Sequence, residues 1–323
     1  MSSDENRNLW GVILAGGEGE RLQSFTRRVV GDVRPKQFCA ITGRHSMLRH
    51  TLDRAQVLIP PQRTLTIITH HHMRYAQEQL SDRPPGTVVV QPSSRGTGVG
   101  ILLPLLKIRK RHADSIVVVF PADHFVIDKE RFMYHVASAA RIVHADPSVV
   151  VILGVNPNRA ESGYGWVERG SRIERCQGAI LHRVRRFWEK PAEKTAQTLF
   201  DNGCLWNTFV LVGHTSVLLN HLRSVVPEIY EPLHSVQDIL DTTAEGGAIM
   251  EVFEHLPSAD FSRAVLQKIP EHLRVLELTG VYWSDWGEEH RILHDVERFN
   301  MRIHGGRSRR GAVPSGVGSL AMR

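Results

Sequence analysis

Short apolar runs alternate with helix-patterned stretches through the first 155 residues, and this alternation limits the fold more than any other feature. The strand-like runs are 10–15, 65–69, 87–90, 116–120 and 149–155, and the stretches with helical spacing are 46–58, 73–80, 98–111 and 128–144. Such a β-α-β-α order predicts a parallel sheet with helices on both faces. The run IVVVF at 116–120 is apolar throughout, as expected of a strand covered on both sides. We therefore expect an α/β fold.

The regular alternation of strands and helices stops at residue 156, after which shorter strands are predicted. The segments predicted as strands are GYGWVERG, ILHRVRRFWEKP and CLWNTFVLVG, and helices are expected at 191–200 and 287–299. The sequence has no internal repeat. We expect a single domain over residues 1–300 with a Rossmann-like, mixed and mostly parallel sheet, in which the second half is laid against the first.

Composition excludes several classes of protein. The 323 residues are 41% hydrophobic, and no apolar run approaches the ~20 residues that span a bilayer. Cys39, Cys176 and Cys204 are far apart and odd in number, which argues against a disulfide framework and favours a reducing cytoplasm. The polar start MSSDENRN is unlike a signal peptide.

The net charge of +6 comes mostly from the end of the chain. Residues 301–323 hold five arginines and no acidic residue, which leaves residues 1–300 close to neutral. A segment rich in Gly, Ser and Arg is expected to be a disordered basic tail. Such a tail can contact nucleic acid. Because a nucleic-acid-binding function would rest on the tail alone, we favour the interpretation that this segment is simply exposed to solvent.

A glycine-rich turn follows the first predicted strand. WGVILAGGEGERL places Gly16, Gly17 and Gly19 directly after a buried run, and Arg21 and Lys36 come next. Glycine lets the backbone approach a ligand closely, and N–H groups in such turns bind phosphate oxygens. A polyphosphate also needs compensating cations. The pattern predicts an anion site, although it matches neither the P-loop nor the dinucleotide fingerprint.

Short motifs follow one another in order along residues 10–300. LAGGEGERL is followed by PKQF, QPSSRGTG, FPADHFV, GYGWVE, VRRFWEKP, LWNTF and YWSDWG. This ordered set resembles the sugar-phosphate nucleotidyltransferases, and among them the mannose-1-phosphate guanylyltransferase branch. The resemblance implies a GT-A-like nucleotidyltransferase fold, with a nucleotide-binding half at about 10–155 and a sugar-phosphate half at about 156–300.

The same resemblance implies an activity. Mannose 1-phosphate would attack the α-phosphorus of GTP in line, giving GDP-mannose and pyrophosphate. No general base is needed, because a phosphate monoester has a second pKa of about 6 and is largely dianionic at neutral pH. Catalysis then consists of positioning and charge neutralisation. The expected partners are these small molecules rather than a membrane or nucleic acid, and a homo-oligomer is left open.

The resemblance also assigns roles to individual residues. Asp123 follows an apolar strand, at the edge where open α/β sheets bind ligands, and Asp285 stands between two tryptophans. These two carboxylates would bind Mg²⁺, while Arg21 and Lys36 would hold the departing pyrophosphate. The expected nucleotide-binding residues are Leu14, Gly16, Gly17, Gly19, Gln91, Arg95, Gly96 and Thr97. The expected sugar-phosphate-binding residues are Gly165, Glu168, Lys190 and Asn207.

Three further expectations concern single positions. Lys190 precedes a proline, which predicts an extended backbone there. His124 is expected to pack or to form a hydrogen bond rather than to bind metal. His70, His71 and His72 look like a metal cluster, but consecutive residues do not share a face and no distant partner is evident. We therefore favour a solvated strand end for these histidines.

Departures from the family pattern leave two other functions open. Glu20 stands where the family usually has Thr, Gln23 replaces a usual Pro, and the stretch before Pro35 is longer than usual. Ser262 and Gln267 occupy positions where acidic residues are usual. One alternative is a nucleotidyltransferase that uses another nucleotide or hexose 1-phosphate. The second is a catalytically silent regulatory subunit that binds a nucleotide sugar.

Overall fold

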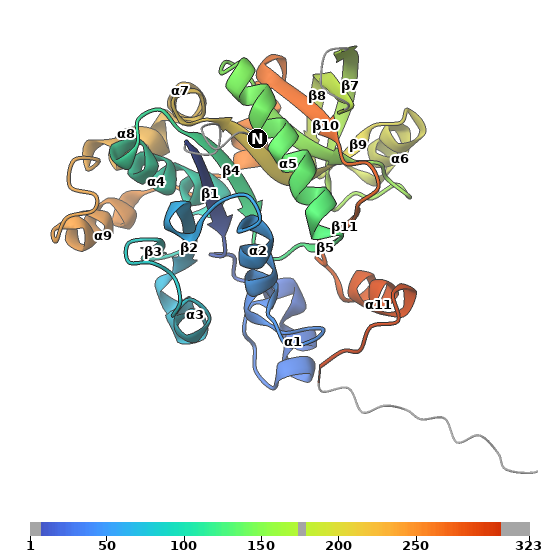
Figure 1. The fold of residues 1–323 in the computed structure, drawn as a ribbon, viewed down its shortest axis with the longest axis horizontal. Helices are drawn as coiled ribbons and strands as arrows, with labels where there is room; N and C mark the ends of the chain where they lie inside the picture. The colour runs from blue at the N-terminus through green and yellow to red at the C-terminus, as the bar shows by residue number, and fades with distance from the viewer. Residues whose placement is uncertain (1–7, 174–178, 305–323) are drawn as a thin grey trace, which may run out of the picture.

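A nine-stranded sheet forms the framework of the molecule (Figure 1). The computed structural model describes residues 8–173 and 179–304. The strand order is β3-β2-β1-β4-β9-β6-β10-β8-β7, and β5 and β11 form a separate two-stranded sheet. The strands are β1 (Leu9–Leu14), β2 (Thr64–Thr69), β3 (Val88–Gln91), β4 (Ile116–Pro121), β5 (Phe125–Ile127), β6 (Val150–Val155), β7 (Gly165–Ile173), β8 (Leu181–Glu189), β9 (Leu205–His214), β10 (Leu273–Glu277) and β11 (Tyr282–Ser284).

Helices cover both faces of this sheet, because successive side chains of its strands point to opposite sides and both sides are apolar. Trp10 and Val12 of β1 belong to a core with α4, α7 and α8, whereas Leu9 and Ile13 belong to a second core with α2 and α5. The helices are α1 (Gln23–Val30), α2 (Met47–Ala55), α3 (Met73–Gln79), α4 (Gly96–Arg111), α5 (Lys129–Ala145), α6 (Glu193–Asp201), α7 (Thr215–Val225), α8 (Pro227–Ser235), α9 (Glu245–His255), α10 (Phe261–Ala264) and α11 (Glu289–Arg298).

The strands and helices predicted for the first half are confirmed within a few residues. The predicted start of α5 is one example: the Asp128 side chain caps the helix by accepting a hydrogen bond from the Arg131 N–H at 2.9 Å. Pro104 lies inside α4, which continues through it. Helices α1, α7, α8 and α9 and strand β10 were not predicted. The mixed, mostly parallel α/β fold is confirmed.

Strand β9 joins the two halves of the chain. It is antiparallel to β4 on one side and to β6 on the other, although both of these strands precede residue 156. The strands β1 to β4 are parallel to one another, and β10 is parallel to β6. The second half is therefore inserted into the sheet of the first rather than laid against it.

The longer stretch before Pro35 folds into α1. Phe25 and Val29 of α1 are buried in a small apolar cluster with Trp286 and Ile292. Trp286 follows Asp285, and its ring stacks on Phe125 with 4.4 Å between centroids. Helix α1 therefore supports the turn that carries Asp285.

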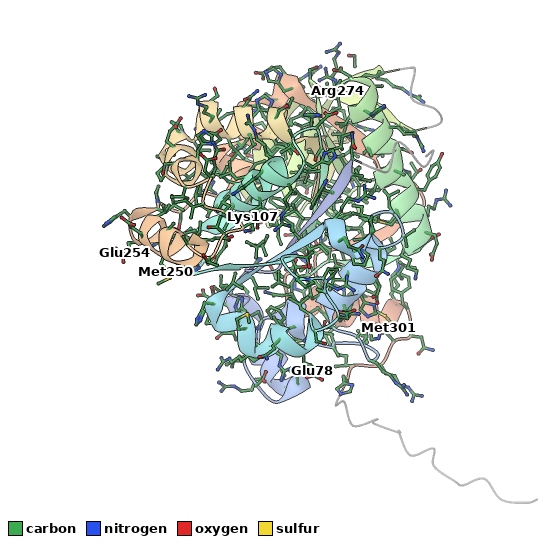
Figure 2. All side chains as sticks on the ribbon, turned by 60° about the vertical axis from the view of Figure 1, so that its left-hand side comes forward. Glu78, Lys107, Met250, Glu254, Arg274 and Met301 are labelled. Carbon is green, nitrogen blue, oxygen red and sulfur yellow. The ribbon has the colours of Figure 1, made fainter. Side chains whose placement is uncertain are left out.

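Helix α9 is attached to α4 by a buried lysine. The Lys107 Nζ donates to both carboxylate oxygens of Glu245, at 2.7 and 2.6 Å, and lies 2.8 Å from an oxygen of Asp241. Figure 2 shows Lys107 inside the molecule and Met250 and Glu254 on the outer side of α9. A buried ammonium group requires such partners, so this contact fixes α9 at one place on the surface.

The described chain ends beyond the predicted domain boundary. Ile303 forms an antiparallel bridge with Thr42, and the His304 N–H donates to the Ile41 carbonyl at 2.9 Å. Ile303 and His304 therefore pair with the segment before α2, and the disordered basic tail stays a prediction. Residues 305–323 and Cys176 lie outside the described part. Among the helices that the structure describes, none is long and apolar enough to cross a membrane.

Candidate active site

A cavity of about 300 Å³ lies at the carboxyl-terminal ends of β1 and β4, which is the edge where open α/β sheets bind ligands. Residues from both halves of the chain line it. The lining residues that the sequence predicted are Leu14, Gly17, Arg21, Lys36, Thr97, Asp123, Gly165, Lys190, Asn207 and Asp285.

The glycine turn borders this cavity and is held by neighbours. Gly19 has φ of 66°, and a Cβ added there would lie 3.0 Å from the Pro35 Cα, so this position requires glycine. The Gln37 side-chain amide donates to the carbonyls of Ala15 at 3.0 Å and Gly17 at 2.7 Å. Gln37 lies in the PKQF motif but was not predicted as a site residue.

The cations Arg21 and Lys36 differ in their surroundings. Arg21 is exposed, lines the cavity and has no ion-pair partner among the described residues. Lys36 is buried. Its Nζ lies 3.2 Å from an oxygen of Asp123 and donates to the backbone carbonyls of Asp285 and, at 2.8 Å, Trp286. Because an ammonium group has three donors, Lys36 uses all of them to join Asp123 to the Asp285 turn.

Asp285 is held in place by hydrogen bonds rather than by the flanking tryptophans. Its Oδ1 accepts from the Tyr164 hydroxyl at 2.8 Å, the Gly287 N–H at 2.9 Å and the Arg291 Nη1 at 2.9 Å. Burial alone would raise the pKa of Asp285, but the charges of Lys36 and Arg291 outweigh it and lower the pKa to about 2. The carboxylate is therefore ionised at neutral pH.

The two aspartates form a donor set that suits Mg²⁺. Each has one oxygen with few other contacts in the described chain: Asp123 Oδ1 lies 3.8 Å from the His124 ring, and Asp285 Oδ2 accepts from Arg291 at 3.1 Å. A carboxylate offers about four lone-pair positions. Both residues line one cavity, and Mg²⁺ prefers carboxylate and phosphate oxygens. The residues present therefore fit the ion.

His124 packs beside this pair, as expected. Its Nδ1 accepts a hydrogen bond from the Trp283 indole N–H at 3.2 Å, and the two rings meet edge to face at 5.1 Å. Burial lowers the pKa of His124 to about 4, so the ring is neutral and can accept this bond.

The expectation for the Lys190 backbone is wrong. Its φ is 46° rather than extended, and its N–H donates to the Tyr164 carbonyl at 3.2 Å. This bond between β8 and the segment before β7 outweighs the local restriction from Pro191. The Lys190 Nζ donates to Glu189 Oε1 at 2.6 Å.

Glu189, rather than Glu168, lines the cavity. Its side chain is buried, and a Cβ added to Gly165 would lie 3.0 Å from its Oε2. Glu168 lies outside the lining and pairs with Arg185 at 3.3 Å. The signal for Glu189 was its place before Lys190 in the EKP motif. Asn207 lines the cavity, and its Oδ1 accepts from the Phe209 N–H at 3.1 Å.

Several residues predicted to bind the nucleotide stand behind the cavity wall. The residues outside the lining are Gly16, Gly19, Gln91, Arg95 and Gly96. Gln91 is buried beside Gly16, and its Nε2 has no hydrogen-bond partner in the described chain. The Arg95 Nη2 donates to the Phe253 carbonyl at 2.8 Å.

The start of α4 is packed against the segment before α10. Gly96 has φ of 81°, and a Cβ there would lie 2.9 Å from the Ala259 carbonyl carbon. Thr97 lines the cavity, and its hydroxyl accepts from the Phe261 N–H at 2.8 Å. Asp260, which was not predicted, caps α10 and also lines the cavity. These contacts give Gly96 a packing role.

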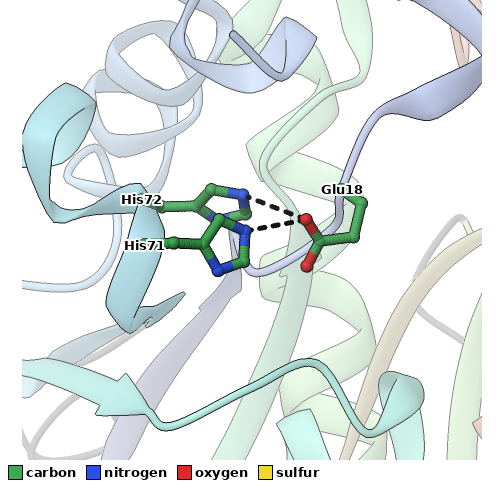
Figure 3. A group of neighbouring side chains, drawn as sticks. All are labelled: Glu18, His71 and His72. Carbon is green, nitrogen blue, oxygen red and sulfur yellow. Dashed lines mark hydrogen bonds and ion pairs between the residues drawn. The ribbon is translucent and has the colours of Figure 1, made fainter.

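The expectation for the consecutive histidines holds for His70 and His71, which are exposed directly after β2, and is wrong for His72. They form a 3-10 turn, η4 (His70–His72), in which His72 is buried. A distant partner exists: the Glu18 carboxylate of the glycine turn lies 2.7 Å from the His71 Nε2 (Figure 3). The tight turn after β2 brings two successive rings to one side, which neither a regular helix nor a regular strand does.

Larger cavities elsewhere hold none of the predicted site residues. One of about 880 Å³ lies near Arg34, Arg49 and His304, and one of about 860 Å³ lies near Asp53 and Met301. The smaller cavity is the candidate site because it combines a glycine turn, cations and two carboxylates at the ligand-binding edge of the sheet.

A glycine turn, cations and two carboxylates at the ligand-binding edge of the sheet are together typical of one class of protein, the nucleotidyl transferases. The family model for nucleotidyl transferases matches residues 10–300, and the chain belongs to this family.

Two curated relatives are similar over most of this chain. The alginate biosynthesis protein AlgA of Pseudomonas syringae pv. tomato is 29% identical over 283 residues, which cover 85% of this chain and 56% of that protein. Mannose-1-phosphate guanylyltransferase 2 of Escherichia coli is 30% identical over 285 residues, which cover 85% of this chain and 57% of that protein. The chain therefore spans little more than half the length of these relatives.

A solved structure shares the fold. The crystal structure of a protein described as a mannose-1-phosphate geranyltransferase, from Thermus thermophilus, superposes with a TM-score of 0.74 at 28% identity. The match covers 87% of this chain and 76% of that chain. The predicted nucleotidyltransferase fold and family are confirmed.

Proposed function

We propose that this chain transfers a guanylyl group from GTP to mannose 1-phosphate, giving GDP-mannose and pyrophosphate. The observation that carries the proposal is one cavity in which Gly17 and Arg21 of the first half meet Lys190 and Asn207 of the second, with Asp123 between them. The name of the Escherichia coli relative supports this choice of substrate.

The reaction needs two phosphates brought into line. An oxygen of mannose 1-phosphate forms a bond to the α-phosphorus of GTP, while the bond from this phosphorus to the bridging oxygen breaks and pyrophosphate leaves with the electron pair. The nucleophile is a phosphate with a second pKa of about 6, so no proton has to be removed at neutral pH. The protein therefore contributes alignment and charge.

We assign the cations of the cavity to the two sides of this reaction. Arg21 has no ion-pair partner among the described residues and would bind the pyrophosphate as it leaves. Lys190 would hold mannose 1-phosphate, with Glu189 setting the position of its ammonium group. Asn207 and Glu189 would bind sugar hydroxyls.

The guanine would lie against the first half. Leu14 and Thr97 line this side of the cavity. Gln91 stands behind them with a buried side-chain N–H₂ that has no partner among the residues the structure describes. A purine carbonyl oxygen is an acceptor for such a donor.

We propose Mg²⁺ as the cofactor. Asp123 and Asp285 would hold the ion, and when bound it neutralises charge on the phosphates. Lys36 joins the two aspartates and keeps a positive charge beside them. Arg291 and Tyr164 fix the orientation of Asp285.

Pyrophosphate release tests the proposal. The protein is assayed with Mg²⁺ and each of GTP, ATP, UTP, CTP and dTTP, combined with mannose 1-phosphate, glucose 1-phosphate or galactose 1-phosphate. We expect kcat/KM to be highest for GTP with mannose 1-phosphate. Asp123→Asn should lower turnover about 100-fold or more, because charge stabilisation is lost. Asp201→Asn, at the exposed end of α6, is the matched control and should act like the wild type.

Two results would contradict the proposal. If kcat/KM were highest for another nucleotide or another sugar 1-phosphate, the proposed substrate pair would be wrong. If calorimetry showed that GDP-mannose binds, but no pair of nucleotide and sugar 1-phosphate released pyrophosphate, the protein would instead be a regulatory subunit. Ser262 favours that second candidate, because it lines the cavity where the family usually has an acid.

We also propose that the protein functions in the cytoplasm. Cys39 and Cys204 are both free and buried, as is usual for proteins of a reducing compartment.

A further inference from the structure

A second group of ligand-forming side chains lies on the outer side of the glycine turn. Glu18 of that turn faces His71 and His72 of η4 (Figure 3). The Glu18 Oε2 lies 2.7 Å from the His71 Nε2 and 3.7 Å from the His72 Nε2. One ligand atom from each residue lies within 4.8 Å of the others. These residues are separate from Asp123 and Asp285.

His72 presents a ring nitrogen that forms no hydrogen bond with any residue the structure describes. Its side chain is 1% exposed, and its Nε2 has no hydrogen-bond partner among the described residues. Its Nδ1 lies 2.7 Å from the Thr69 hydroxyl oxygen. When Nδ1–H donates to that oxygen, Nε2 carries the lone pair and faces Glu18. Leaving such a buried atom without a partner costs free energy.

The chemistry of these three side chains selects a type of ion. Two imidazole nitrogens and one carboxylate oxygen form the ligand set of many sites for Zn²⁺ and similar ions. Mg²⁺ prefers oxygen ligands only. We propose that Glu18, His71 and His72 bind a borderline transition-metal ion of the Zn²⁺ class. Thr69 is a positioning residue that orients the His72 ring, as the outer partner of a metal-bound histidine does.

The proposed metal site lies in the same turn as a residue that lines the cavity. Glu18 lies between Gly17, which lines the cavity, and Gly19, which is packed on Pro35. A metal ion would therefore join the glycine turn to the segment after β2. The binding claim is independent of the proposed function, because it concerns residues outside the cavity lining.

Cobalt absorbance provides a direct test. Tag-free protein is treated with a chelator, dialysed and titrated with Co²⁺, whose visible bands report tetrahedral nitrogen and oxygen ligands, and Zn²⁺ is then added in competition. We expect one equivalent to bind and Zn²⁺ to displace it, whereas millimolar Mg²⁺ should not. Glu18→Gln and His71→Ala should each weaken binding at least tenfold.

Matched controls lie beside the proposed ligands. Glu20→Gln changes an exposed acid of the same turn, and His70→Ala changes an exposed histidine of η4; both should bind within twofold of the wild type. Glu18 and His71 are not fully buried, so their variants are expected to fold, and circular dichroism checks this. Absence of binding to the wild type, or unchanged binding by both ligand variants, would overturn the site. The titration uses no nucleotide, so it is unaffected if the proposed activity fails.

Discussion

Asp285 is the residue whose chemistry depends most on its neighbours. Its carboxylate is mostly buried, yet Lys36 and Arg291 keep it ionised. Trp283 and Trp286 flank it in the sequence, but the groups that orient it are the Tyr164 hydroxyl and the Arg291 guanidinium. A buried ionised carboxylate is stable only with such partners.

The pH dependence of unfolding should reveal this carboxylate. Its folded pKa of about 2 lies below the usual aspartate value of 3.8, so its contribution to stability is fully present above the unfolded pKa and is lost as pH falls toward 2. The pKa difference corresponds to roughly 2 kcal/mol. We expect urea unfolding between pH 6 and pH 3 to show a shallower loss of stability for Asp285→Asn than for the wild type. Equal slopes would contradict the assignment.

At the scale of elements, the start of α4 is in close contact with the segment before α10. Gly96 meets the Ala259 carbonyl, and the Gly98 N–H donates to the same group at 2.8 Å. This contact places Thr97 on the cavity wall and joins α4 to the segment that carries Asp260.

A pair of glycine substitutions tests this contact. Gly96→Ala should lower the free energy of unfolding by about 3 kcal/mol, because the left-handed φ strains alanine and the Cβ meets backbone. Gly247→Ala, in α9, has nothing within 4 Å of the added Cβ and should raise stability by about 0.5 kcal/mol. Urea denaturation of both variants measures the difference. A Gly96→Ala protein as stable as the wild type would show that the two segments are not in close contact.

At the scale of the whole molecule, the sheet makes the two halves interdependent. Strand β9 fills the space between β4 and β6. Without the second half, β4 keeps only β1 as a partner and β6 has neither of its two partners, β9 and β10. Unpaired inner strands expose backbone groups and apolar faces.

A fragment experiment follows from this topology. Residues 1–155 expressed alone should lack a cooperative urea transition, because β4 and β6 lose β9 and β6 also loses β10. The full chain, measured by the same circular dichroism signal, should unfold in a single transition. A sigmoid transition of the fragment would show that the first half folds on its own.

Local patterns were sufficient for some of these features and insufficient for others. The glycine turn, Lys36, Asp123 and Asp285 were predictable because short motifs carry them. Glu189 was missed although it lies in one of those motifs, because a charged strand end is usually solvated. Helices α7 to α9 and strand β10 were missed because no motif marked their positions.

The sequence alone determined the α/β class, the nucleotidyltransferase resemblance and most of the predicted residues that line the candidate cavity, because apolar periodicity and short motifs are local properties. Only the tertiary structure decided that β9 enters the first half of the sheet, that Arg291 and Tyr164 hold Asp285, and that Glu18 reaches His71 and His72. Each of these contacts joins residues that are far apart in the chain. No local pattern encodes such a distance, because it is set by how the strands pair and the helices pack.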